Sequence, residues 1–428
     1  MVRCIVANER GHVLARRRGR GWRLLTVERR GWTPADAVGR LLGRPAVLLK
    51  PLGPDLAALA CSDPNLERTD LAWRPVGDLE TGERQEATTW LSELADPAGI
   101  QPEWFRPGWL REATAWADDV LAALGWRRAG PPFQVRHWSL SAVVRLPTDR
   151  GDVYLKSVLP AFAIEPAVTR AVAAWADGPP LDVLAHDPGR GRWLSADHAG
   201  VCGEDVDGGS PPAGARALAR LQVRAASRHD LLLATGCEQL DAAAVAASID
   251  PLLLREDLWA VRHERALAGD ELDRLRACRP WLSDLCERLA VSPIPLSLTH
   301  GDFHPGNVAL TARGWLVHDW SFAAISHPFF DLANWLHDVP PDSEPAHVAA
   351  YLEPWAATHG MSAARAAWSS AKPLGAYYAL TRLAAVLDAT PADQWFSWLP
   401  MLFGWARRLY RVHADPDFRY GLPRSGRR

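Results

Sequence analysis

The chain has 428 residues, 48% of them hydrophobic, and 48 Lys and Arg residues against 50 Asp and Glu residues give a formal net charge of −2. This length predicts two or three domains with ordinary globular cores. A nucleic-acid-binding surface needs a basic excess, which is missing here, so nucleic acid is excluded as the main partner. No apolar run reaches the ~20 residues of a membrane span, and the N-terminal stretch lacks a signal-peptide core. We therefore expect a cytoplasmic protein that has no membrane partner.

Cysteine and lysine are both sparse. The six cysteines are scattered and form no C-x-x-C pair, which disfavours a zinc ribbon or a redox motif and predicts reduced, buried thiols. The only lysines are Lys50, Lys156 and Lys372, so each of them is a candidate for a specific role.

Residues 1–100 predict a small α/β or α+β domain. Strands are expected at 2–7, 13–16, 22–27, 46–49 and 71–75, and Asn8-Glu9-Arg10-Gly11 predicts a hairpin turn. A helix is expected over 34–42, with Thr33 as its N-cap. This order of elements is similar to the Nudix fold. The segment TPADAVGRLLGR lacks the carboxylate cluster of Nudix enzymes, which implies a degenerate domain with a structural or regulatory role.

The remaining chain divides into a strand-rich and a helical part. Residues 97–108 are Pro- and Gly-rich and resemble a linker. Residues 101–130 are therefore predicted to be a linker that continues into a helix at 110–124. Residues 131–200 predict strands at 134–138, 142–146 and 152–158, a helix at 163–175, and strands at 181–185 and 192–196. Residues 201–415 predict mostly helices, including 215–226, 240–247 and 271–289, before a tail at 416–428.

The stretch LTHGDFHPGNVAL, residues 298–310, places polar side chains between two strand-like flanks. His300 and His304 have the four-residue spacing by which one helix face binds zinc. Gly301 lies between them, and Pro305-Gly306 follow. In a helix interior each Gly costs about 1 kcal/mol and each Pro about 3 kcal/mol, so these residues disfavour a helix. No Glu follows the first histidine to act as a base. The pattern therefore predicts a loop, which is either a polar turn or a phosphoryl-transfer site.

Three residues favour phosphoryl transfer over an ordinary turn. Asp302 and Asn307 supply oxygen-bearing side chains on the predicted loop, and Asp319 follows the predicted strand 314–318. Phosphoryl transfer needs a carboxylate near the acceptor hydroxyl and oxygen ligands for Mg²⁺, which takes one or two protein carboxylates plus phosphate.

HGDFHPGN followed by VHDW resembles the aminoglycoside phosphotransferase family, which shares a protein-kinase-like fold with choline kinases. The resemblance implies that Asp302 is the catalytic or hydroxyl-orienting carboxylate and that Asn307 and Asp319 bind Mg²⁺. It also implies that His300 and His304 brace the loop. The expected fold class is α+β, a bilobal protein-kinase-like fold with a small antiparallel β lobe and a larger helical lobe.

The resemblance also assigns a nucleotide site. Lys156, on the third strand of the small lobe, is expected to pair with the nucleotide phosphates, and Glu165 is expected to orient this lysine. For Glu165 an N-terminal helix carboxylate that faces the helix dipole is the open alternative. The loop HWSLSAV replaces the usual glycines, so Ser139 and Ser141 are candidates to cradle phosphate, with a plain β-turn as the alternative.

The motif HPFFDLA contains Asp331, for which we expect a helix N-cap role, and the resemblance implies that it gives structural support to the catalytic loop. Asp338, Asp342 and Glu344 could form an acidic acceptor pocket, although surface solvation is the favoured interpretation.

The sequence predicts a Mg²⁺-dependent kinase that uses ATP or GTP and a small-molecule hydroxyl acceptor. The alternative is a catalytically inactive, pseudokinase-like nucleotide-binding or regulatory module. The acceptor, which could be aminoglycoside-like, a sugar or an amino alcohol, stays open, as does the oligomeric state.

Overall fold

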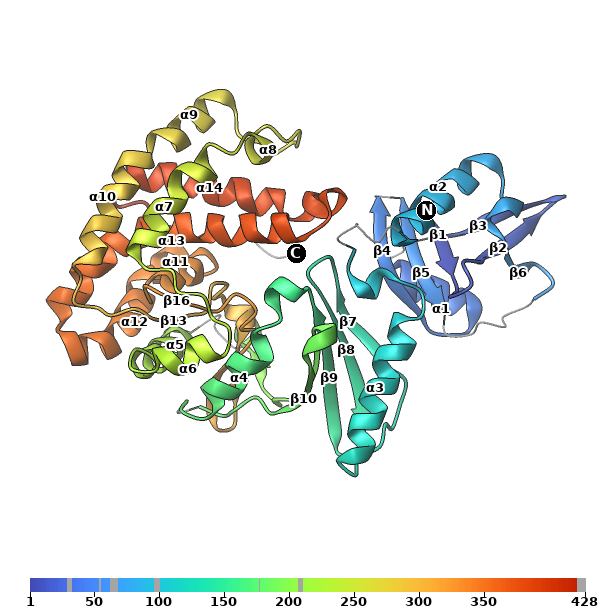
Figure 1. The fold of residues 1–428 in the computed structure, drawn as a ribbon, viewed down its shortest axis with the longest axis horizontal. Coiled ribbons are helices and arrows are strands. Elements are labelled where there is room, and N and C mark those ends of the chain that lie inside the picture. Colours follow the sequence, from blue (N-terminus) through green and yellow to red (C-terminus); the bar gives the residue numbers. More distant parts are fainter. Residues whose placement is uncertain are drawn as a thin grey trace. The chain divides into compact units, whose positions relative to one another are not determined.

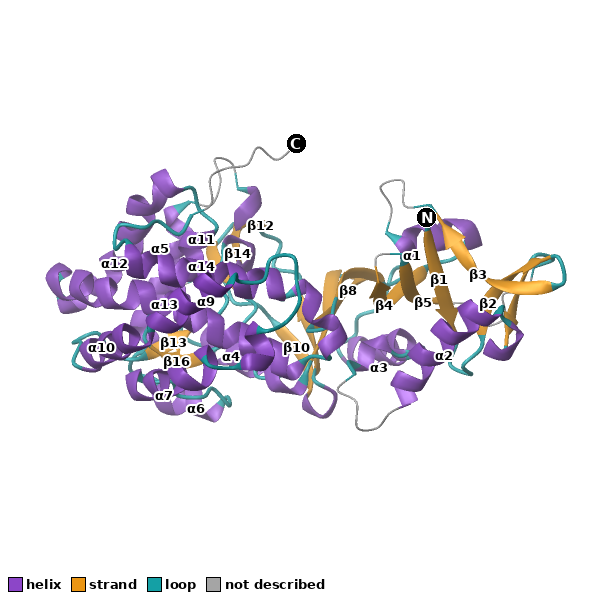
Figure 2. Cartoon of the chain, turned by 90° about the horizontal axis from the view of Figure 1, so that it is seen from above, coloured by secondary structure: helices purple, strands orange, loops and turns teal. Residues whose placement is uncertain are grey.

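The computed structural model describes residues 1–28, 33–53, 55–61, 68–95, 101–176, 178–206 and 211–421. The start of the predicted linker, 97–100, and the end of the predicted tail, 422–428, lie outside these residues. The chain forms two compact units, Met1–Leu159 with Asp187–Leu194, and Pro160–His186 with Ser195–Arg428. The predicted α+β class is confirmed, because a β-rich N-terminal domain is followed by an antiparallel sheet and a mostly helical part (Figures 1 and 2).

The N-terminal domain is built on a six-stranded sheet in the order β4-β5-β1-β3-β2-β6, in which β1 and β5 run parallel. Its strands are β1 (Val2–Ala7), β2 (Val13–Arg18), β3 (Gly21–Val27), β4 (Ala46–Gly53), β5 (Leu56–Cys61) and β6 (Leu71–Arg74). Its helices are α1 (Pro34–Leu42) and α2 (Thr81–Ala95). The predicted strands and the first helix are confirmed, whereas β5 and α2 were not predicted.

Alternation along β1 explains why both faces of this sheet are covered. Cys4 and Val6 belong to a core that includes Val38 of α1, whereas Ile5 belongs to a second core that includes Trp90 of α2. Successive side chains of a strand point to opposite faces, so a continuous apolar strand needs a cover on each side.

The end of the predicted linker is a packed structure. Trp104 and Phe105 lie in a short 3-10 helix, Glu103–Phe105, and are 2% and 0% exposed. The indole Nε1 of Trp104 donates to the carbonyl oxygen of Trp138 over 2.7 Å. Helix α3 (Trp109–Ala123) follows, close to the predicted helix. The predicted linker therefore contains a packed turn with two large buried aromatic side chains.

The second sheet begins with an antiparallel meander of β7 (Phe133–His137), β8 (Ser141–Thr148) and β9 (Gly151–Val158). The strand β11 (Arg192–Ala196) lies beside β9 in the strand order. All four correspond to predicted strands. Lys156 lies on β9 opposite Val143 of β8, so it is on the third strand, as the sequence predicts.

Side chains of β7 bind the backbone of β4 within the first unit. Gln134 accepts from Leu48 N over 3.0 Å through Oε1 and donates to Leu48 O over 2.9 Å through Nε2. His137 Nε2 lies 2.6 Å from Leu49 O, and Gln134 Nε2 lies 2.7 Å from His137 Nδ1. A carbonyl oxygen and an amide NH₂ face the two ring nitrogens, so the imidazole is neutral with its proton on Nε2. This network joins the N-terminal domain to the second sheet.

We expect His137 to make the stability of this unit pH-dependent. Burial lowers its pKa to about 4, because a desolvated site disfavours the charged imidazolium. The unfolded chain binds this proton near pH 6.5, so stability falls as pH decreases from about 6.5 to 4, by roughly 3 kcal/mol. Urea unfolding of the protein and of His137→Gln across this range checks the result. A pH slope as steep in His137→Gln as in the wild type, or a slope that disappears in the control His12→Gln, would contradict it.

The second unit is mostly helical (Figure 2). Its helices are α4 (Glu165–Ala173), α5 (Pro212–Ala225), α6 (His229–Ala234), α7 (Ala242–Leu253), α8 (Glu256–Trp259), α9 (Gly269–Ala277), α10 (Arg279–Ala290), α11 (Phe330–His337), α12 (Glu344–His359), α13 (Met361–Ala389) and α14 (Leu399–Ala414). Its short strands are β12 (Val201–Cys202), β13 (Ser297–Thr299), β14 (Val308–Thr311), β15 (Gly314–Val317) and β16 (Ala324–Ser326), and β10 (Val183–Asp187) ends at the unit boundary. The long α13 packs against α10, α11, α12 and α14 (Figure 1).

One predicted helix, 271–289, is wrong as a single element. The structure has α9 and α10 instead, separated at Cys278. Pro280 explains the break, because proline lacks the N–H that a helix interior needs and is tolerated only in the first turn.

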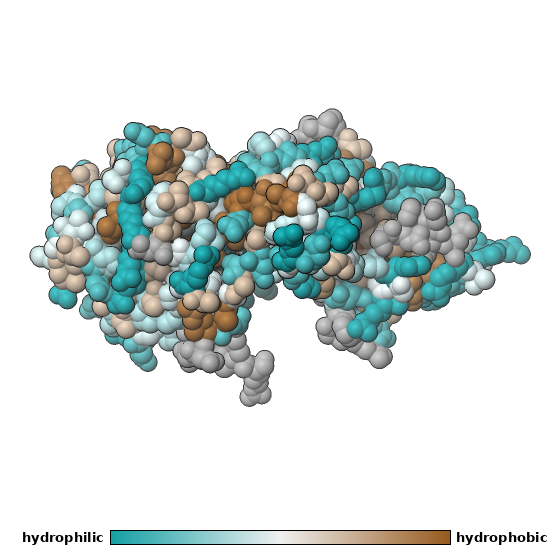
Figure 3. Space-filling model, turned by 90° about the horizontal axis from the view of Figure 1, so that it is seen from below, coloured by the Kyte–Doolittle hydropathy of each residue, from teal (hydrophilic) through white to brown (hydrophobic). Residues whose placement is uncertain are grey.

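The surface of the protein is polar over most of one face. The face in Figure 3 is largely hydrophilic, with apolar residues in separate groups. Within the described residues, every helix is too short or too polar to cross a membrane. The six cysteines are free thiols, and four of them, Cys4, Cys237, Cys278 and Cys286, are buried.

Candidate active site

The predicted catalytic loop lies between two strand pairs of the second unit. β13 pairs with β16, and β14 pairs with β15 in a register that sets Val308 opposite Val317. Asn307 immediately precedes β14 and its carbonyl accepts from His318 N over 3.0 Å, so the segment leading to Asp319 is tied to the loop. Asn307 Nδ2 donates to the carbonyl of Asp302 over 2.9 Å. The structure therefore brings together the three residues that the sequence singled out.

Gly301 gives the loop its sharp turn. Its φ is +78°, and a Cβ at this position would lie 2.4 Å from the carbonyl oxygen of Phe322. Glycine alone combines a left-handed backbone with room for this close approach. The turn presents Asp302, whose side chain is 52% exposed, to solvent.

His300 is fully buried and uses both ring nitrogens within the protein. Nε2 lies 2.8 Å from the carbonyl oxygen of His318, and Nδ1 accepts from Asp302 N over 3.3 Å. Burial lowers the pKa of this imidazole, which agrees with one donor and one acceptor nitrogen. Because neither nitrogen is available to a metal ion, these contacts suit the predicted bracing role.

His304 holds the second half of the loop. Its Nδ1 accepts from Gly306 N over 3.0 Å, which starts the 3-10 turn Pro305–Asn307. Its Nε2 lies 3.9 Å from Asp302 Oδ2, and Nδ1 lies 3.9 Å from Glu204 Oε1. This side chain is 32% exposed, so it reaches the loop surface beside the predicted catalytic carboxylate.

Asp319 has the unusual backbone conformation φ +66° for a residue other than glycine. Asp and Asn are the side chains most tolerated there, and such outliers concentrate at functional sites. Asp319 Oδ1 lies 3.0 Å from Ser321 Oγ, and the same hydroxyl lies 2.8 Å from Glu165 Oε2. Ser321 thus links the predicted metal ligand to the predicted lysine-orienting glutamate.

Glu165 is the first residue of α4 and is 2% exposed. A glutamate that served only the helix dipole would be expected in solvent, so its burial and its bond with Ser321 favour a specific role over that alternative. Sequence reasoning missed Ser321. Its only signal was its position two residues after Asp319.

Asp331 is not an N-cap, contrary to the expectation. Helix α11 begins at Phe330 with Phe329 as its cap, and Asp331 is fully buried in the first turn. Its Oδ2 accepts from His300 N (2.7 Å) and Gln222 Nε2 (2.8 Å), and its Oδ1 accepts from Gly301 N (2.9 Å). Burial raises the pKa of this carboxyl to about 7, although these donors act in the opposite direction. The contacts are those that support of the loop requires.

The predicted phosphate contacts belong to the first unit, together with Lys156. Lys156 is 9% exposed on β9, and Ser139 and Ser141 are 3% and 5% exposed. Ser141 Oγ accepts from the indole Nε1 of Trp138 over 2.7 Å. The Ser141 hydroxyl therefore takes part in the hairpin turn, and its contact with phosphate stays a prediction.

The three acidic residues after the loop have different surroundings. Part of Asp338 is accessible to solvent, yet partial burial by the surrounding protein disfavours the charged carboxylate and raises its pKa to about 6. The negative charges of Asp302 and Glu204 act in the same direction, whereas His304 lowers this pKa. Asp342 is fully exposed. Glu344 is buried 3.4 Å from Lys372, so the expectation of surface solvation is wrong for this residue.

Solved structures that match this chain include phosphotransferases and kinases. A macrolide 2′-phosphotransferase type I has 17% identity and a TM-score of 0.47, over 68% of this chain and 96% of that one. A putative fructosamine-3-kinase from Thermobifida fusca YX-ER1 has 16% identity and a TM-score of 0.44, over 68% and 97%. A choline kinase from Cryptosporidium parvum Iowa II has 9% identity and a TM-score of 0.48, over 68% and 91%. At this level of similarity they carry no argument about the acceptor.

Among curated proteins, none matches this sequence. The sequence profile of the phosphotransferase enzyme family (APH) matches residues 133–374, more than half of the 428 residues. The match begins at the first residue of β7 and contains the loop, Lys156 and Asp331, and it leaves the N-terminal domain outside. The chain therefore belongs to the phosphotransferase enzyme family.

Proposed function

We propose that the protein is a Mg²⁺-dependent phosphotransferase that moves the γ-phosphate of ATP or GTP to a hydroxyl group of a small molecule. The observation that carries this proposal is the arrangement of Asp302, Asn307 and Asp319. Hydrogen bonds fix one carboxylate at an exposed turn and two oxygen-bearing side chains at the ends of paired strands. Phosphoryl transfer depends mainly on such positioning and on charge neutralisation.

The donor set suits Mg²⁺. Asn307 uses its amide nitrogen for the Asp302 carbonyl, so its oxygen remains for a ligand, and Asp319 supplies a carboxylate. Two protein oxygens plus phosphate oxygens are the usual coordination of Mg²⁺ at phosphoryl-transfer sites. When bound, the ion neutralises the phosphates and the charge that develops on the leaving oxygen.

The protein residues would act as follows. Asp302 orients the acceptor hydroxyl and receives its proton as the acceptor oxygen bonds to the γ-phosphorus and the bond to the leaving oxygen of the nucleoside diphosphate breaks. Lys156 pairs with the nucleotide phosphates, and Glu165 orients this lysine. His300, His304 and Asp331 hold the loop in place.

We expect Asp319→Ala to abolish the Mg²⁺-dependent part of nucleotide binding. The wild-type protein should melt several degrees higher with ATP and Mg²⁺ than with ATP and a chelator, because a ligand that binds only the folded state stabilises it. Thermal unfolding measures the effect, and Asp284→Ala, an exposed aspartate on α10, is the matched control. Equal stabilisation with and without Mg²⁺, unchanged in Asp319→Ala, would refute the kinase and favour an inactive nucleotide-binding module.

The acceptor class can be approached through charge. The carboxylates of Glu204 and Asp302 each lie 3.9 Å from a ring nitrogen of His304, so this side of the loop is acidic. An acidic surface favours an amine-bearing acceptor such as an amino alcohol or an aminoglycoside-like compound over a neutral sugar. A screen of hydroxyl acceptors by coupled ATP turnover, with each amine paired to its neutral analogue, tests this preference.

A further inference from the structure

A cavity in the helical unit is built from residues other than those proposed for phosphoryl transfer. It measures about 320 Å³ and is lined by α4, α5, residues 178–181, β15 and the turn that precedes β15. This volume is at the lower end of the range for small-molecule sites. None of the residues proposed for phosphoryl transfer lines it.

The cavity is cationic. Its lining includes Arg216, Arg220, Arg224 and Arg313, and among the residues that the structure describes no Asp or Glu lines it. The first three follow one another at four-residue intervals on α5, so they share one helix face. Arg216 pairs with Glu353 over 2.7 Å. Within the described ranges, no carboxylate forms an ion pair with Arg220 or Arg313.

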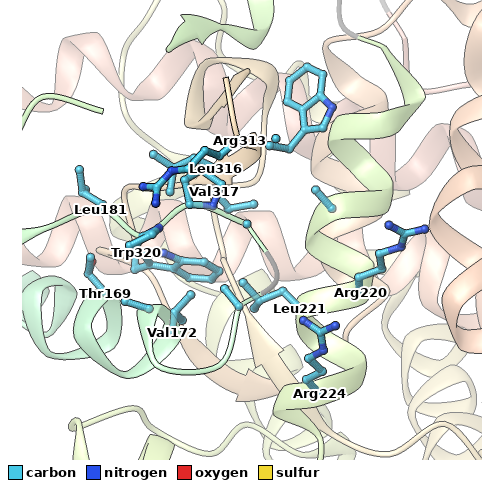
Figure 4. A pocket seen from close by; sticks show the side chains of 18 of the residues that line it. Thr169, Val172, Leu181, Arg220, Leu221, Arg224, Arg313, Leu316, Val317 and Trp320 are labelled. Atoms are coloured by element: carbon cyan, nitrogen blue, oxygen red, sulfur yellow. The ribbon is translucent and has the colours of Figure 1, made fainter. Parts of the chain in front are cut away.

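The rest of the lining is apolar and aromatic. Figure 4 shows Trp320, Val172 and Leu181 on the side from which Arg313 extends, with Arg220 and Arg224 opposite, on α5. Trp320 is 1% exposed, whereas Trp315 on β15 also lines the cavity and is partly exposed, so the indole of Trp315 offers apolar surface. Flat apolar surface beside guanidinium groups suits a ligand that has an anionic end and a flat body.

One buried polar group of the lining has no partner. Thr169, on α4, is 4% exposed, and its hydroxyl forms no hydrogen bond. Because this oxygen is inaccessible, it is not offered to a ligand in the cavity, and recognition depends on the arginines.

We propose that this cavity binds a small organic anion, a phosphate or a carboxylate carried on a flat apolar body, through Arg220 and Arg313. Thr169 lies one helical turn after Glu165, and Trp320 directly follows Asp319. A bound anion therefore contacts the two elements that carry the proposed lysine-orienting and metal-binding residues, which makes the cavity an effector site. The effector role rests on the proposed function, whereas binding itself does not.

Calorimetry on the full chain tests the binding with four probes: 1-naphthyl phosphate, 1-naphthoate, 1-naphthol and inorganic phosphate. We expect at least one of the two naphthyl anions to bind at a single site, and the relative affinities distinguish phosphate from carboxylate. Naphthol and inorganic phosphate should bind at least tenfold more weakly, because each lacks half of the recognised chemistry. Arg313→Ala and Arg220→Ala should each weaken binding about 10- to 100-fold, the usual effect of losing a hydrogen bond to a charged group.

Two further variants locate the site. Arg262→Ala, an exposed arginine outside the cavity, should keep wild-type affinity, and Ala217→Trp should block binding by filling the cavity. Excess ATP with Mg²⁺ should not displace the naphthyl anion. The proposal is overturned if neither anion binds, or if the binding is unchanged in Arg313→Ala and Arg220→Ala.

Displacement by ATP would also overturn it, because the probe would then occupy the nucleotide site. Anion binding without any phosphotransfer would count against the proposed function alone, and phosphotransfer without anion binding against this inference alone.

Discussion

Asp302→Ala is expected to lower turnover by about 10²- to 10⁴-fold while nucleotide binding stays close to wild type. This range is the usual contribution of a positioned acid or base. The Asp302 side chain is half exposed, and its closest ionisable neighbour is His304 at 3.9 Å, so removing the carboxylate leaves the buried hydrogen bonds of the loop in place. Coupled ATP turnover with the acceptor from the screen measures the loss, and thermal shift with ATP and Mg²⁺ measures nucleotide binding.

Asp342→Ala is the matched control for this variant. Asp342 is also an aspartate of the helical unit, but it is fully exposed and lies 3.7 Å from Arg419. It should retain wild-type turnover. Activity retained in Asp302→Ala would remove this residue from the mechanism, and a parallel loss of nucleotide binding would assign it to the nucleotide site.

Asp331→Ala is expected to destabilise the helical unit by about 3–5 kcal/mol. The substitution leaves the backbone N–H groups of His300 and Gly301 and the amide of Gln222 without their acceptor. Each buried donor without a partner costs about 1–3 kcal/mol. Urea unfolding measures the loss, and hydrogen exchange should show that the His300 and Gly301 amides lose protection.

Asp331→Asn separates charge from shape in this experiment. It keeps the size of the side chain and one acceptor oxygen, so its loss of stability should be smaller than that of Asp331→Ala. Because burial raises the pKa of Asp331 to about 7, ionisation in the fold is unfavourable. The wild type should therefore lose stability relative to Asp331→Asn as pH rises from about 4 to 7. Equal stability of all three proteins would contradict the loop-support role.

The strands of the two large sheets were easier to predict from the sequence than helix α2 and the break between α9 and α10. Strands such as β1 and β9 have local apolar patterns and turn residues that one chain segment carries by itself. Helix α2 escaped prediction because only Ala87 and Trp90 are buried in its 15 residues, which is too weak an apolar stripe. Pro280 indicates a helix break, but the helical spacing of apolar residues on both sides of it predicted one continuous helix over 271–289.

The site was predictable where the chemistry is contiguous in the chain. Asp302, Asn307 and Asp319 lie within 18 residues and are recognisable by type and order. Ser321 and Gln222 were missed because their roles depend on partners far away in the sequence: Glu165 is 156 positions from Ser321, and Asp331 is 109 from Gln222. A single sequence records no such pairing, and only the fold brings these groups together.

The match to the family begins at residue 133, and the next residue, Gln134, is hydrogen-bonded to Leu48 of the N-terminal domain. The amide side chain of Gln134 gives β4 the donor and the acceptor that a neighbouring strand would give. Trp104 and Phe105, which precede the family match in the sequence, are also buried. The point where the recognisable family sequence starts is therefore not a point where the polypeptide can be cut. A protein shortened to residues 131–428 would leave Gln134 and His137 without their backbone partners, so expression and crystallisation should keep residues 1–130 attached.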